Sequence, residues 1–471
     1  MSAKLPDIKT KFPEWYQEVI RQAELSDQSP VRGCIVIRPY GTEIWESIKS
    51  ILDKKIKDTG HKNAIFPLLI PESFLKKEAE HIEGFAPELA IVTHAGGKKL
   101  AEPLVIRPTS ETMVHHMFAQ WIKSWRDLPL KINQWANVMR WEMRPRAFLR
   151  TSEFFWQEGH TAHATREEAK EEALLMLGHY KDLAENYLAI PVVVGQKSNL
   201  EKFPGADETH TFEAFMPDAK ALQMGTSHML SQNFAKSFDM KYQDKDSKMA
   251  YPWLTSWGVT TRLIGAVIMS HGDEKGLILP PKIAPIEAVI IPIYKTDEQR
   301  DAVLKAAQQV KEELDGLVRV HIDADEHKKP GSKFFHWEMK GVPLRLEIGP
   351  RDLEKKHAMV ADRLGLEKEG VLFADMAQVL PRKLEAFQKA LFDRAKTRLD
   401  NMWTVKDKLA DIVEVSESSV CLTGFCGSDE CERMLKPKKL SIRCVLSDNT
   451  VKNCFGCDKA STADVVVARS Y

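Results

Sequence analysis

Two stretches with alternating bulky and charged residues, 137–144 and 148–160, constrain the fold most strongly. They flank a turn around Pro145 and therefore predict an antiparallel hairpin, in which residues two apart share a face. One face would carry two arginines, a glutamate and a phenylalanine: Arg140, Glu142, Arg150 and Phe154. This set suits a bound nucleotide, because guanidinium groups bind phosphate and an aromatic ring can stack on a base. An ordinary salt-bridged polar face is the alternative interpretation.

The length and composition indicate a soluble cytoplasmic enzyme of two or three domains. The chain has 471 residues, with 67 basic and 67 acidic side chains, so bulk charge gives no argument for nucleic-acid binding. The first ten residues lack the apolar stretch of a secretory signal, and no run of eighteen apolar residues predicts a transmembrane helix. Six of the seven cysteines follow residue 420, which favours metal binding over disulfides.

The first seventy residues predict two helices and two strands. The helices are expected at 14–25 and 42–60, and the strands at 34–38 and 65–71. Thr42 is expected to cap the second helix and Gly60 to end it. Pro67 interrupts the second strand, and because proline cannot donate to a ladder, that strand suits an edge or an interface.

A strand ending at Pro108 leads into a turn with two hydroxyls and a carboxylate, Thr109, Ser110 and Glu111. The hydroxyls can cap the helix that follows. Such a cap fixes the backbone and leaves the carboxylate available to a cation.

Further elements are expected after the hairpin: a helix over 165–189, strands over 191–194 and 209–215, a turn over 223–228, and a glycine turn over 256–262 that enters an apolar helix. Thr165 and Glu168 form a capping box. Arg262 falls in the first turn of the apolar helix, where the helix dipole already favours anions, and it suits a triphosphate.

Residues 276–285 are proline-rich and indicate a domain junction, after which the pattern changes to strand–helix–strand. Arg345 and Glu347 alternate with apolar residues and so share one strand face, for which a solvated sheet face is the alternative to a binding role. A charged helix is expected over 382–402.

Four cysteines near the end of the chain form two closely spaced pairs, Cys426, Cys431, Cys454 and Cys457. Paired thiolates on two turns are the ligands of a tetrahedral structural Zn²⁺ site. Gly456 is expected to ease the second turn. Cys421 and Cys444 lie outside this pattern and are interpreted as core residues.

Arg140-x-Glu142 followed by Arg150-x-x-x-Phe154 resembles the second signature motif of class II aminoacyl-tRNA synthetases. The surrounding sequence resembles the archaeal and eukaryotic type of prolyl-tRNA synthetase. The resemblance covers nearly the whole chain. It identifies the helix and proline-bearing strand near the N-terminus as the first motif, which forms the dimer interface in the family, and Arg262 as the arginine of the third motif.

The resemblance implies an α/β fold with a class II antiparallel-sheet catalytic core, an α/β anticodon-binding domain and a C-terminal zinc-binding α+β domain. The expected boundaries are 1–282, 283–385 and 386–471, with no editing insertion in the first domain. The implied activity is ligation of proline to tRNA(Pro) through a prolyl-adenylate, with ATP and Mg²⁺. No protein nucleophile is needed, so catalysis is positioning and charge stabilisation.

Arg140 and Arg262 are the implied catalytic residues. The implied ATP-binding residues are Arg140, Glu142, Arg150, Thr151, Phe154, Gln223, Thr226, Thr260 and Arg262, with Glu213 as a further member of the nucleotide and metal side. The implied proline-binding residues are Thr109, Glu111, Arg140, Trp156, Glu158, His160, His228, Trp257 and Gly258. Arg345, Glu347 and Arg351 are expected to contact the anticodon, and the terminal Tyr471 to pack back towards the active site.

A proline pocket distinguishes proline from a smaller amino acid by only about 1–3 kcal/mol of binding free energy per missing methylene, so misactivation of cysteine and alanine is expected.

Three alternative functions are open. The first is a class II synthetase for threonine, serine or glycine, although the metal ligands of a threonyl enzyme are not seen among Thr109, Arg140 and His228. The second is an inactive paralogue that binds tRNA or senses amino acids. The third is a zinc-dependent nucleic-acid module alone, which leaves the first 280 residues without a role.

Overall fold

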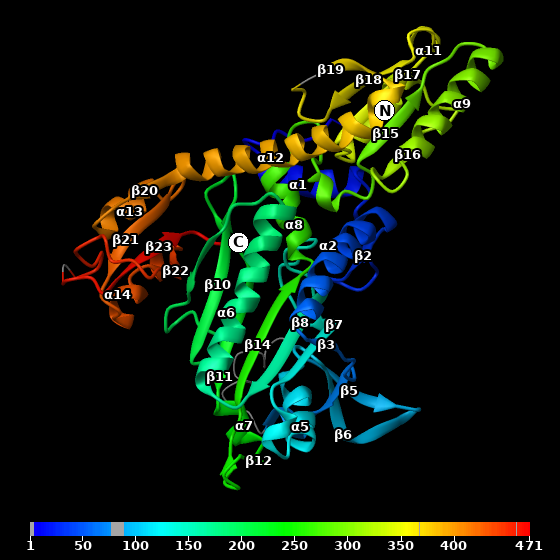
Figure 1. Ribbon diagram of the computed structural model, residues 1–471. Helices are drawn as coiled ribbons and strands as arrows, with labels where there is room; N and C mark the ends of the chain where they lie inside the picture. Colours follow the sequence, from blue (N-terminus) through cyan, green and yellow to red (C-terminus); the bar gives the residue numbers. More distant parts are fainter. Residues whose placement is uncertain (1–3, 77–88, 367, 458) are drawn as a thin grey trace.

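The structure is a computed structural model that describes residues 4–76, 89–366, 368–457 and 459–471 (Figure 1). Its centre is a sheet whose strands pair antiparallel from β9 to β7, with the short β3 added parallel at one edge. The strands of this central sheet are β3 (Lys62–Asn63), β7 (Leu130–Met139), β8 (Glu153–His163), β9 (Val193–Gln196), β10 (Glu208–Phe215), β11 (Ala221–Ser231) and β14 (Trp253–Thr260).

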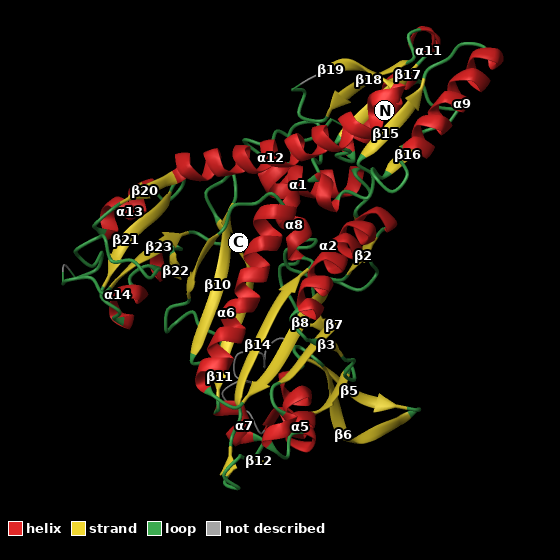
Figure 2. Cartoon of the chain, in the orientation of Figure 1, coloured by secondary structure: helices red, strands yellow, loops and turns green. Residues whose placement is uncertain are grey.

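Helices pack on this sheet and enclose the largest hydrophobic core (Figure 2). They are α1 (Phe12–Gln22), α2 (Pro39–Asp58), α6 (Arg166–Asp182) and α8 (Arg262–His271). The predicted apolar stripe of the second helix is confirmed, because Ile44, Ile48, Leu52 and Ile56 are fully buried. That helix begins at Pro39 and not at Thr42, since proline at the first helical position has its φ already set for a helix. The capping box of Thr165 and Glu168 is also confirmed, and α6 ends in a π-helical turn, Leu183–Tyr187.

Two segments expected to be turns are strands. Residues 223–228 lie within β11 and residues 256–260 within β14, and the two strands pair with each other. Their glycines allow close strand approach and do not bend the chain. A Cβ on Gly225 would lie 2.6 Å from the carbonyl oxygen of Gly258, and a Cβ on Gly258 would lie 2.9 Å from that of Gln157.

Smaller elements complete this part of the chain. They are β1 (Ser26–Gln28), β2 (Ile35–Ile37), β4 (Leu69–Pro71), α3 (Glu72–Lys76), β5 (Ala90–Ala95), β6 (Lys98–Ile106), α5 (Glu111–Trp121), α7 (Asn233–Ser237), β12 (Tyr242–Gln243) and β13 (Met249–Ala250). The strand expected over 65–71 is therefore shorter than predicted. Only its last three residues pair, with β6, so Pro67 stays outside the ladder.

The strand–helix–strand pattern predicted after the junction is confirmed. A five-stranded sheet contains β16 (Val320–Ile322), β15 (Ala288–Pro292), β17 (Leu344–Ile348), β18 (His357–Asp362) and β19 (Lys368–Leu372), in that order. The first three strands are parallel and the last two are added antiparallel. Its helices are α9 (Asp297–Glu313), α10 (Pro330–Met339) and α11 (Pro350–Glu354).

A single helix, α12 (Met376–Met402), connects this sheet to the C-terminal elements (Figure 1). It begins six residues before the expected start at 382, contains Pro381, and runs without interruption across the expected boundary at 385/386. The elements that follow are β20 (Trp403–Val405), α13 (Leu409–Val415), β21 (Val420–Phe425), α14 (Asp429–Arg433), β22 (Ser441–Val445) and β23 (Ala463–Ala468).

The C-terminal strands join the central sheet and do not form a sheet of their own. β22 pairs with β9 through Val445 and Gln196, so one sheet of eleven strands runs from β20 to β3. The sequence did not predict this continuity. Within the described ranges, no helix has both the length and the apolar character needed to span a bilayer.

Candidate active site

The strand register brings the predicted site residues to one face of the central sheet. Every second side chain of β8 points to this face, and the side chains opposite them on the neighbouring strands point to the same face. His160 pairs with Ser256, which pairs with His228, and Glu158 pairs with Gly258, which pairs with Thr226. The face borders a cavity of about 440 Å³, and every residue predicted to bind ATP or proline lines it.

Arginines gather at one end of the cavity. The guanidinium carbon of Arg140 lies 5.5 Å from the ring centroid of Phe154 and 5.6 Å from that of Trp156. Its Nε donates to the carbonyl oxygen of Pro108 at 3.0 Å. Arg140 follows the end of β7 at Met139, so the predicted paired face does not extend to Arg140, Glu142 or Arg150. These three residues belong to the connection between β7 and β8, which leaves the strand ladder after Met139 and rejoins it at Glu153, and they reach the cavity from there.

Arg262, the first residue of α8, is held by backbone oxygens. It donates from Nη1 to the carbonyl of Gln223 at 3.1 Å and from Nε to that of Leu149 at 3.3 Å. Burial, followed by the charges of Arg150 and Arg140, lowers the pKa of Arg262 to about 10, so it remains a cation at neutral pH. Arg150 is 3.8 Å from the carboxylate of Glu142. This end of the cavity therefore suits a polyanion.

Carboxylates occupy the part of the cavity nearest α5. The hydroxyl of Thr109 donates to Glu111, and that of Ser110 donates to Glu158. Ser110 precedes α5 as predicted, but its side chain makes no capping bond: its oxygen accepts from Gln134 and its hydrogen is donated to the buried Glu158. His160 Nε2 lies 3.1 Å from Glu158. This arrangement of acidic groups suits an ammonium ion.

Burial affects the ionisation of these groups in different directions. It raises the pKa of Glu111, against the charges of His160 and Arg140, which lower it. Burial also opposes the charge on Glu158, but hydrogen bonds from His160, Ser110 and Gln134 outweigh it, and the pKa of Glu158 lies below its ordinary value. The pKa of His160 is raised, because its contact with Glu158 outweighs its burial.

His228 is fixed between two threonines. Its Nδ1 lies 3.0 Å from the hydroxyl of Thr209 and its Nε2 lies 2.9 Å from that of Thr226. The ring of Phe203 lies 4.5 Å from the His228 ring, measured between centroids. Neither Phe203 nor Thr209 was predicted to belong to the site.

Trp257 lines the cavity together with Gly258, as expected for the Trp257-Gly258 segment, but its indole ring is directed to the other face of the sheet. The ring lies 5.2 Å from His61 and 6.5 Å from Tyr180, measured between centroids. A Cβ on Gly159 would lie 2.1 Å from the indole, so this position accepts no side chain. The reason is the strand period of two, which places Trp257 opposite to its neighbours Ser256 and Gly258.

Glu213 also differs from the prediction. Its carboxylate is fully buried and accepts from Lys197 Nζ at 2.6 Å and from Arg443 Nη2 at 2.9 Å. It is not among the residues that line the cavity in the described part of the chain. Its two partners occupy the oxygens that were expected to serve the nucleotide and metal side.

Sequence reasoning missed a whole segment of the cavity wall, the connection from β9 to β10. Its members at the cavity are Lys197, Glu201, Lys202, Phe203 and Pro204. No periodic pattern or motif marks this connection in the sequence. Its place at the cavity follows from the pairing of β9 with β10, which no local signal reveals.

Arg345 and Glu347 lie on one face of β17, as predicted, but this face is not simply solvated. Arg345 Nε donates to Glu347 at 3.2 Å, and its Nη1 donates to Glu338 at 3.2 Å. Lys368 Nζ also donates to Glu347 at 3.2 Å. The Arg345 guanidinium lies over the ring of Phe334 at 4.2 Å. Arg351 is exposed on α11.

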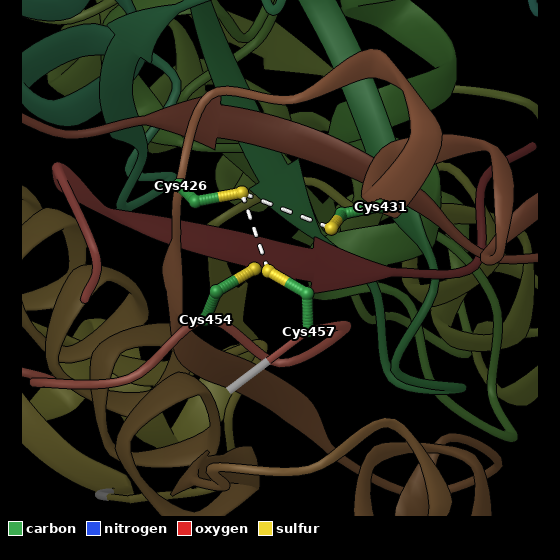
Figure 3. A group of neighbouring side chains, drawn as sticks. All are labelled: Cys426, Cys431, Cys454 and Cys457. Atoms are coloured by element: carbon green, nitrogen blue, oxygen red, sulfur yellow. Dashed lines mark hydrogen bonds between the residues drawn. The ribbon is translucent and has the colours of Figure 1, made fainter. Parts of the chain in front are cut away.

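Figure 3 shows the four cysteines directed towards one point, with their sulfur atoms within 4.8 Å of one another. The Sγ of Cys426 lies 3.7 Å from those of Cys431 and Cys457. A tetrahedral ion with metal–sulfur bonds of about 2.3 Å requires sulfur–sulfur distances of about 3.8 Å, so the thiol set fits Zn²⁺. A Cβ on Gly456 would lie 3.0 Å from the Cβ of Cys431, so a larger residue at this position would press on the cysteine cluster.

Cys421 and Cys444 are buried, which confirms their interpretation as core residues. Tyr471 packs against the main core, its hydroxyl donates to Asp218 at 2.7 Å, and its backbone N–H donates to the carbonyl of Ala221 at 3.1 Å. The C-terminus is therefore docked at the turn between β10 and β11.

Known families and proteins match both the catalytic and the anticodon-binding parts of the chain. Residues 96–271 match the family described as the tRNA synthetase class II core domain (G, H, P, S and T), and residues 287–383 match an anticodon binding domain. The chain is 48% identical to the proline–tRNA ligase of Alkaliphilus oremlandii in an alignment of 474 positions that covers 99% of this chain and 98% of that ligase. It is 49% identical to the proline–tRNA ligase of Borreliella burgdorferi over 488 residues, which cover both chains fully.

Solved structures of prolyl-tRNA synthetase from Cryptosporidium parvum are also similar. One, complexed with L-proline and AMP, has a TM-score of 0.93 and 40% identity and covers 99% of each chain. Another, complexed with halofuginone and AMPPNP, has a TM-score of 0.94 and 42% identity over the same share of each chain.

Proposed function

This chain belongs to the proline–tRNA ligase family of class II aminoacyl-tRNA synthetases, and on that basis we propose which of its residues carry the reaction. The reaction is the ATP-dependent ligation of proline to tRNA. The proline carboxylate attacks the α-phosphate of ATP, and the bond from that phosphorus to pyrophosphate breaks. The prolyl group of the adenylate then passes to the 3′ end of tRNA(Pro). The observation that carries the assignment of roles is the cavity with arginines at one end and carboxylates at the other.

ATP binds at the arginine end in this proposal. Arg140 contacts the α-phosphate and the proline carboxylate together, and Arg150 and Arg262 hold the remaining phosphates. Phe154 and Arg262 enclose the adenine, and Glu142 accepts a hydrogen bond from its amine. Each arginine stabilises charge that develops on phosphate in the transition state, where fixed donors are most effective. Thr151 and Thr260 line the same end of the cavity.

Mg²⁺ shares the charge of the phosphates when it is bound with ATP. Glu213 is not proposed as a ligand, because Lys197 and Arg443 occupy its oxygens. The amide of Gln223 and the hydroxyl of Thr226 remain as neutral groups on the nucleotide side of the cavity.

Proline binds at the carboxylate end. Its secondary ammonium meets Thr109 and Glu111, and Glu158 supports this end with a second negative charge. The ring lies against Trp156, His160 and His228, with the backbone at Gly258 closing the pocket. Of the predicted proline residues, only the Trp257 ring is left without a contact in this proposal, because it faces the opposite core.

Pyrophosphate exchange across a panel of amino acids tests this assignment. Proline is expected to be the best substrate, with cysteine and alanine activated at a kcat/KM lower by about 10- to 200-fold, since a missing methylene removes only about 1–3 kcal/mol. Threonine, serine and glycine serve as the comparison. The best exchange with threonine or serine would contradict the proline pocket, and no exchange with cysteine or alanine at high concentration would contradict the misactivation.

The inactive-paralogue alternative has no support. The relatives at 48–49% identity over the full chain are proline–tRNA ligases, and the cavity contains Arg140, Arg150 and Arg262.

The four cysteines are proposed to hold a structural Zn²⁺. Metal analysis of the purified chain is expected to find about one zinc per chain, and Cys454→Ser is expected to lose it, because a structural site needs four ligands. Cys421→Ser changes a buried cysteine outside the cluster and should keep the metal. Full zinc content in the Cys454→Ser variant would contradict the proposal.

The dimer, the domain limits and the location also remain proposals. Pairing of two copies through α2 and β4 is supported by exposed apolar side chains at and beside β4, where Ile65 is 94% exposed and Leu68 and Leu69 are also exposed.

The functional units are proposed as 1–282, 283–385 and 386–471, with Arg345, Glu347 and Arg351 contacting the anticodon. A cytoplasmic location is proposed from the reaction, which uses the tRNA of protein synthesis.

A further inference from the structure

The wall of the cavity beside His228 is the connection from β9 to β10, residues 197–204. Lys202 and Phe203 of this connection line the cavity. The Phe203 ring lies 4.5 Å from the His228 ring, and its backbone N–H donates to the hydroxyl of Thr209 at 3.0 Å. The connection therefore closes the end of the cavity assigned to proline.

The middle of this wall is exposed, whereas its first two residues are buried. Residues 199–201 and 204 are exposed, and its first two residues, Lys197 and Ser198, are buried. A surface connection of this kind takes its position from its buried ends. The contacts of Lys197 and Ser198 thus set the position of the wall together with those of Phe203 to His228 and Thr209.

Both buried residues are held by the C-terminal domain. The Ser198 hydroxyl donates to the carboxylate of Glu432, which is 5% exposed and follows Cys431 directly in α14. Lys197 Nζ donates to the backbone carbonyl of Arg443 in β22 at 3.0 Å. These contacts lie at the junction where β22 pairs with β9, close to β10 (Figure 1).

A buried cluster of three charged side chains, Lys197, Glu213 and Arg443, stabilises the same junction. Glu213 accepts from Lys197 at 2.6 Å and from Arg443 at 2.9 Å, and the three side chains are at most 8% exposed. Buried ion pairs with this geometry impose one arrangement on their partners, because any displacement leaves a charge without compensation. The backbone of β22 at Arg443 is therefore a fixed support for Lys197.

We propose that Glu432 is a positioning residue for proline binding. From the C-terminal domain, it holds Ser198 and so sets the wall formed by residues 197–204 against His228. The proline pocket is then completed by a residue adjacent to the cysteine cluster and more than two hundred positions away in the chain. This inference rests on the proposed function, specifically on the assignment of the His228 end of the cavity to proline.

Pyrophosphate exchange with the full-length chain tests it, with KM measured separately for proline and for ATP. Ser198→Ala and Glu432→Ala are each expected to raise the KM for proline about tenfold, because each removes a buried hydrogen bond to a charged group. The KM for ATP and the kcat are expected to stay within about twofold, since the arginine end is untouched. The double variant should be no worse than either single one.

Two matched variants separate positioning from general damage. Glu432→Gln keeps an oxygen that can accept from Ser198 and is expected to restore the proline KM. Glu430→Ala removes an exposed carboxylate from the same helix and is expected to change neither KM. Zinc content and the thermal unfolding midpoint show whether each variant is folded. If Glu432→Ala does not fold, Ser198→Ala tests the same bond without altering the cysteine domain.

An unchanged proline KM in folded Ser198→Ala would overturn the inference, as would a parallel rise in the KM for ATP. The wild-type chain distinguishes this failure from a failure of the proposed function. Normal proline-dependent exchange in the wild type with unchanged variants overturns the role of Glu432 alone. Absence of proline-dependent exchange in the wild type overturns the proposed function and the inference together.

Discussion

The arginines of the cavity and the arginine of the five-stranded sheet have different neighbours. Arg140 and Arg262 are oriented by backbone carbonyls, those of Pro108, Gln223 and Leu149. Arg345 is oriented by two carboxylates, those of Glu338 and Glu347, and lies over the ring of Phe334. Carbonyl contacts fix a guanidinium without cancelling its charge, whereas carboxylate contacts cancel it.

This difference separates two kinds of recognition. The carbonyl-oriented guanidinium groups of Arg140 and Arg262 suit phosphate, on which negative charge develops further during the reaction. An arginine that is paired with carboxylates and stacked on a ring presents a planar, hydrogen-bonding surface of the kind that suits an RNA base. We therefore expect the two regions to respond differently to the loss of one arginine.

The largest effect is expected for Arg140→Ala. Proline-dependent pyrophosphate exchange should fall by at least about a hundredfold in kcat/KM, because a preorganised donor to the reacting phosphate is lost. The matched control is Arg144→Ala, which removes an exposed guanidinium from the same connection. Equal activity in the two variants would show that Arg140 does not contact the reacting groups.

A smaller effect, in a different assay, is expected for Arg345→Ala. Aminoacylation of tRNA(Pro) should fall by about tenfold in kcat/KM, as for one base contact, while pyrophosphate exchange is unchanged. Lys368 still pairs with Glu347 in this variant, so the buried carboxylate keeps a partner. Arg300→Ala, which removes an arginine paired with Asp297 on α9, serves as control. A fall in exchange that equals the fall in aminoacylation would contradict the division between the two regions.

The smallest effect is the pH dependence of KM, which is expected to differ between proline and ATP because they bind at different ends of the cavity. Burial raises the pKa of Glu111, so its carboxylate is lost as the pH falls through a range above that of an ordinary glutamate. The KM for proline should therefore rise on acidification, because the ammonium loses its partner. The pKa of Arg262 is about 10, so its charge is constant from pH 6 to 9 and the KM for ATP should be constant as well. Parallel pH profiles for the two KM values would contradict this assignment.

Local patterns predicted the elements that are stabilised by neighbours in the sequence. The apolar spacing of Ile44, Ile48 and Ile56 predicted α2, and the capping box of Thr165 and Glu168 predicted α6. The spacing of the cysteine pairs predicted the cysteine cluster, because the two members of a pair are close in the chain. Family motifs located most of the predicted cavity residues, with Glu213 as the exception that does not line the cavity in the described part of the chain.

The errors occurred where distant segments decide the conformation. Gly225 and Gly258 are typical of turns, yet they lie in paired strands because only glycine permits the close backbone approach there. Trp257 lines the cavity as predicted, but the direction of its ring was not foreseen, because the register of β14 with β8 directs the indole into the core. Residues 197–204 carry no local signal, because their place at the cavity follows from the pairing of β9 with β10.

The sequence alone determined the chemical groups of this protein: three motif arginines, the acidic residues at the other end of the cavity, and four paired cysteines. Only the tertiary structure decided which of these groups face one another, and it joined the C-terminal strands to the catalytic sheet through β22 and β9. The physical reason is that strand pairing satisfies backbone hydrogen bonds between segments far apart in the chain. No local spacing specifies which strand will be the neighbour.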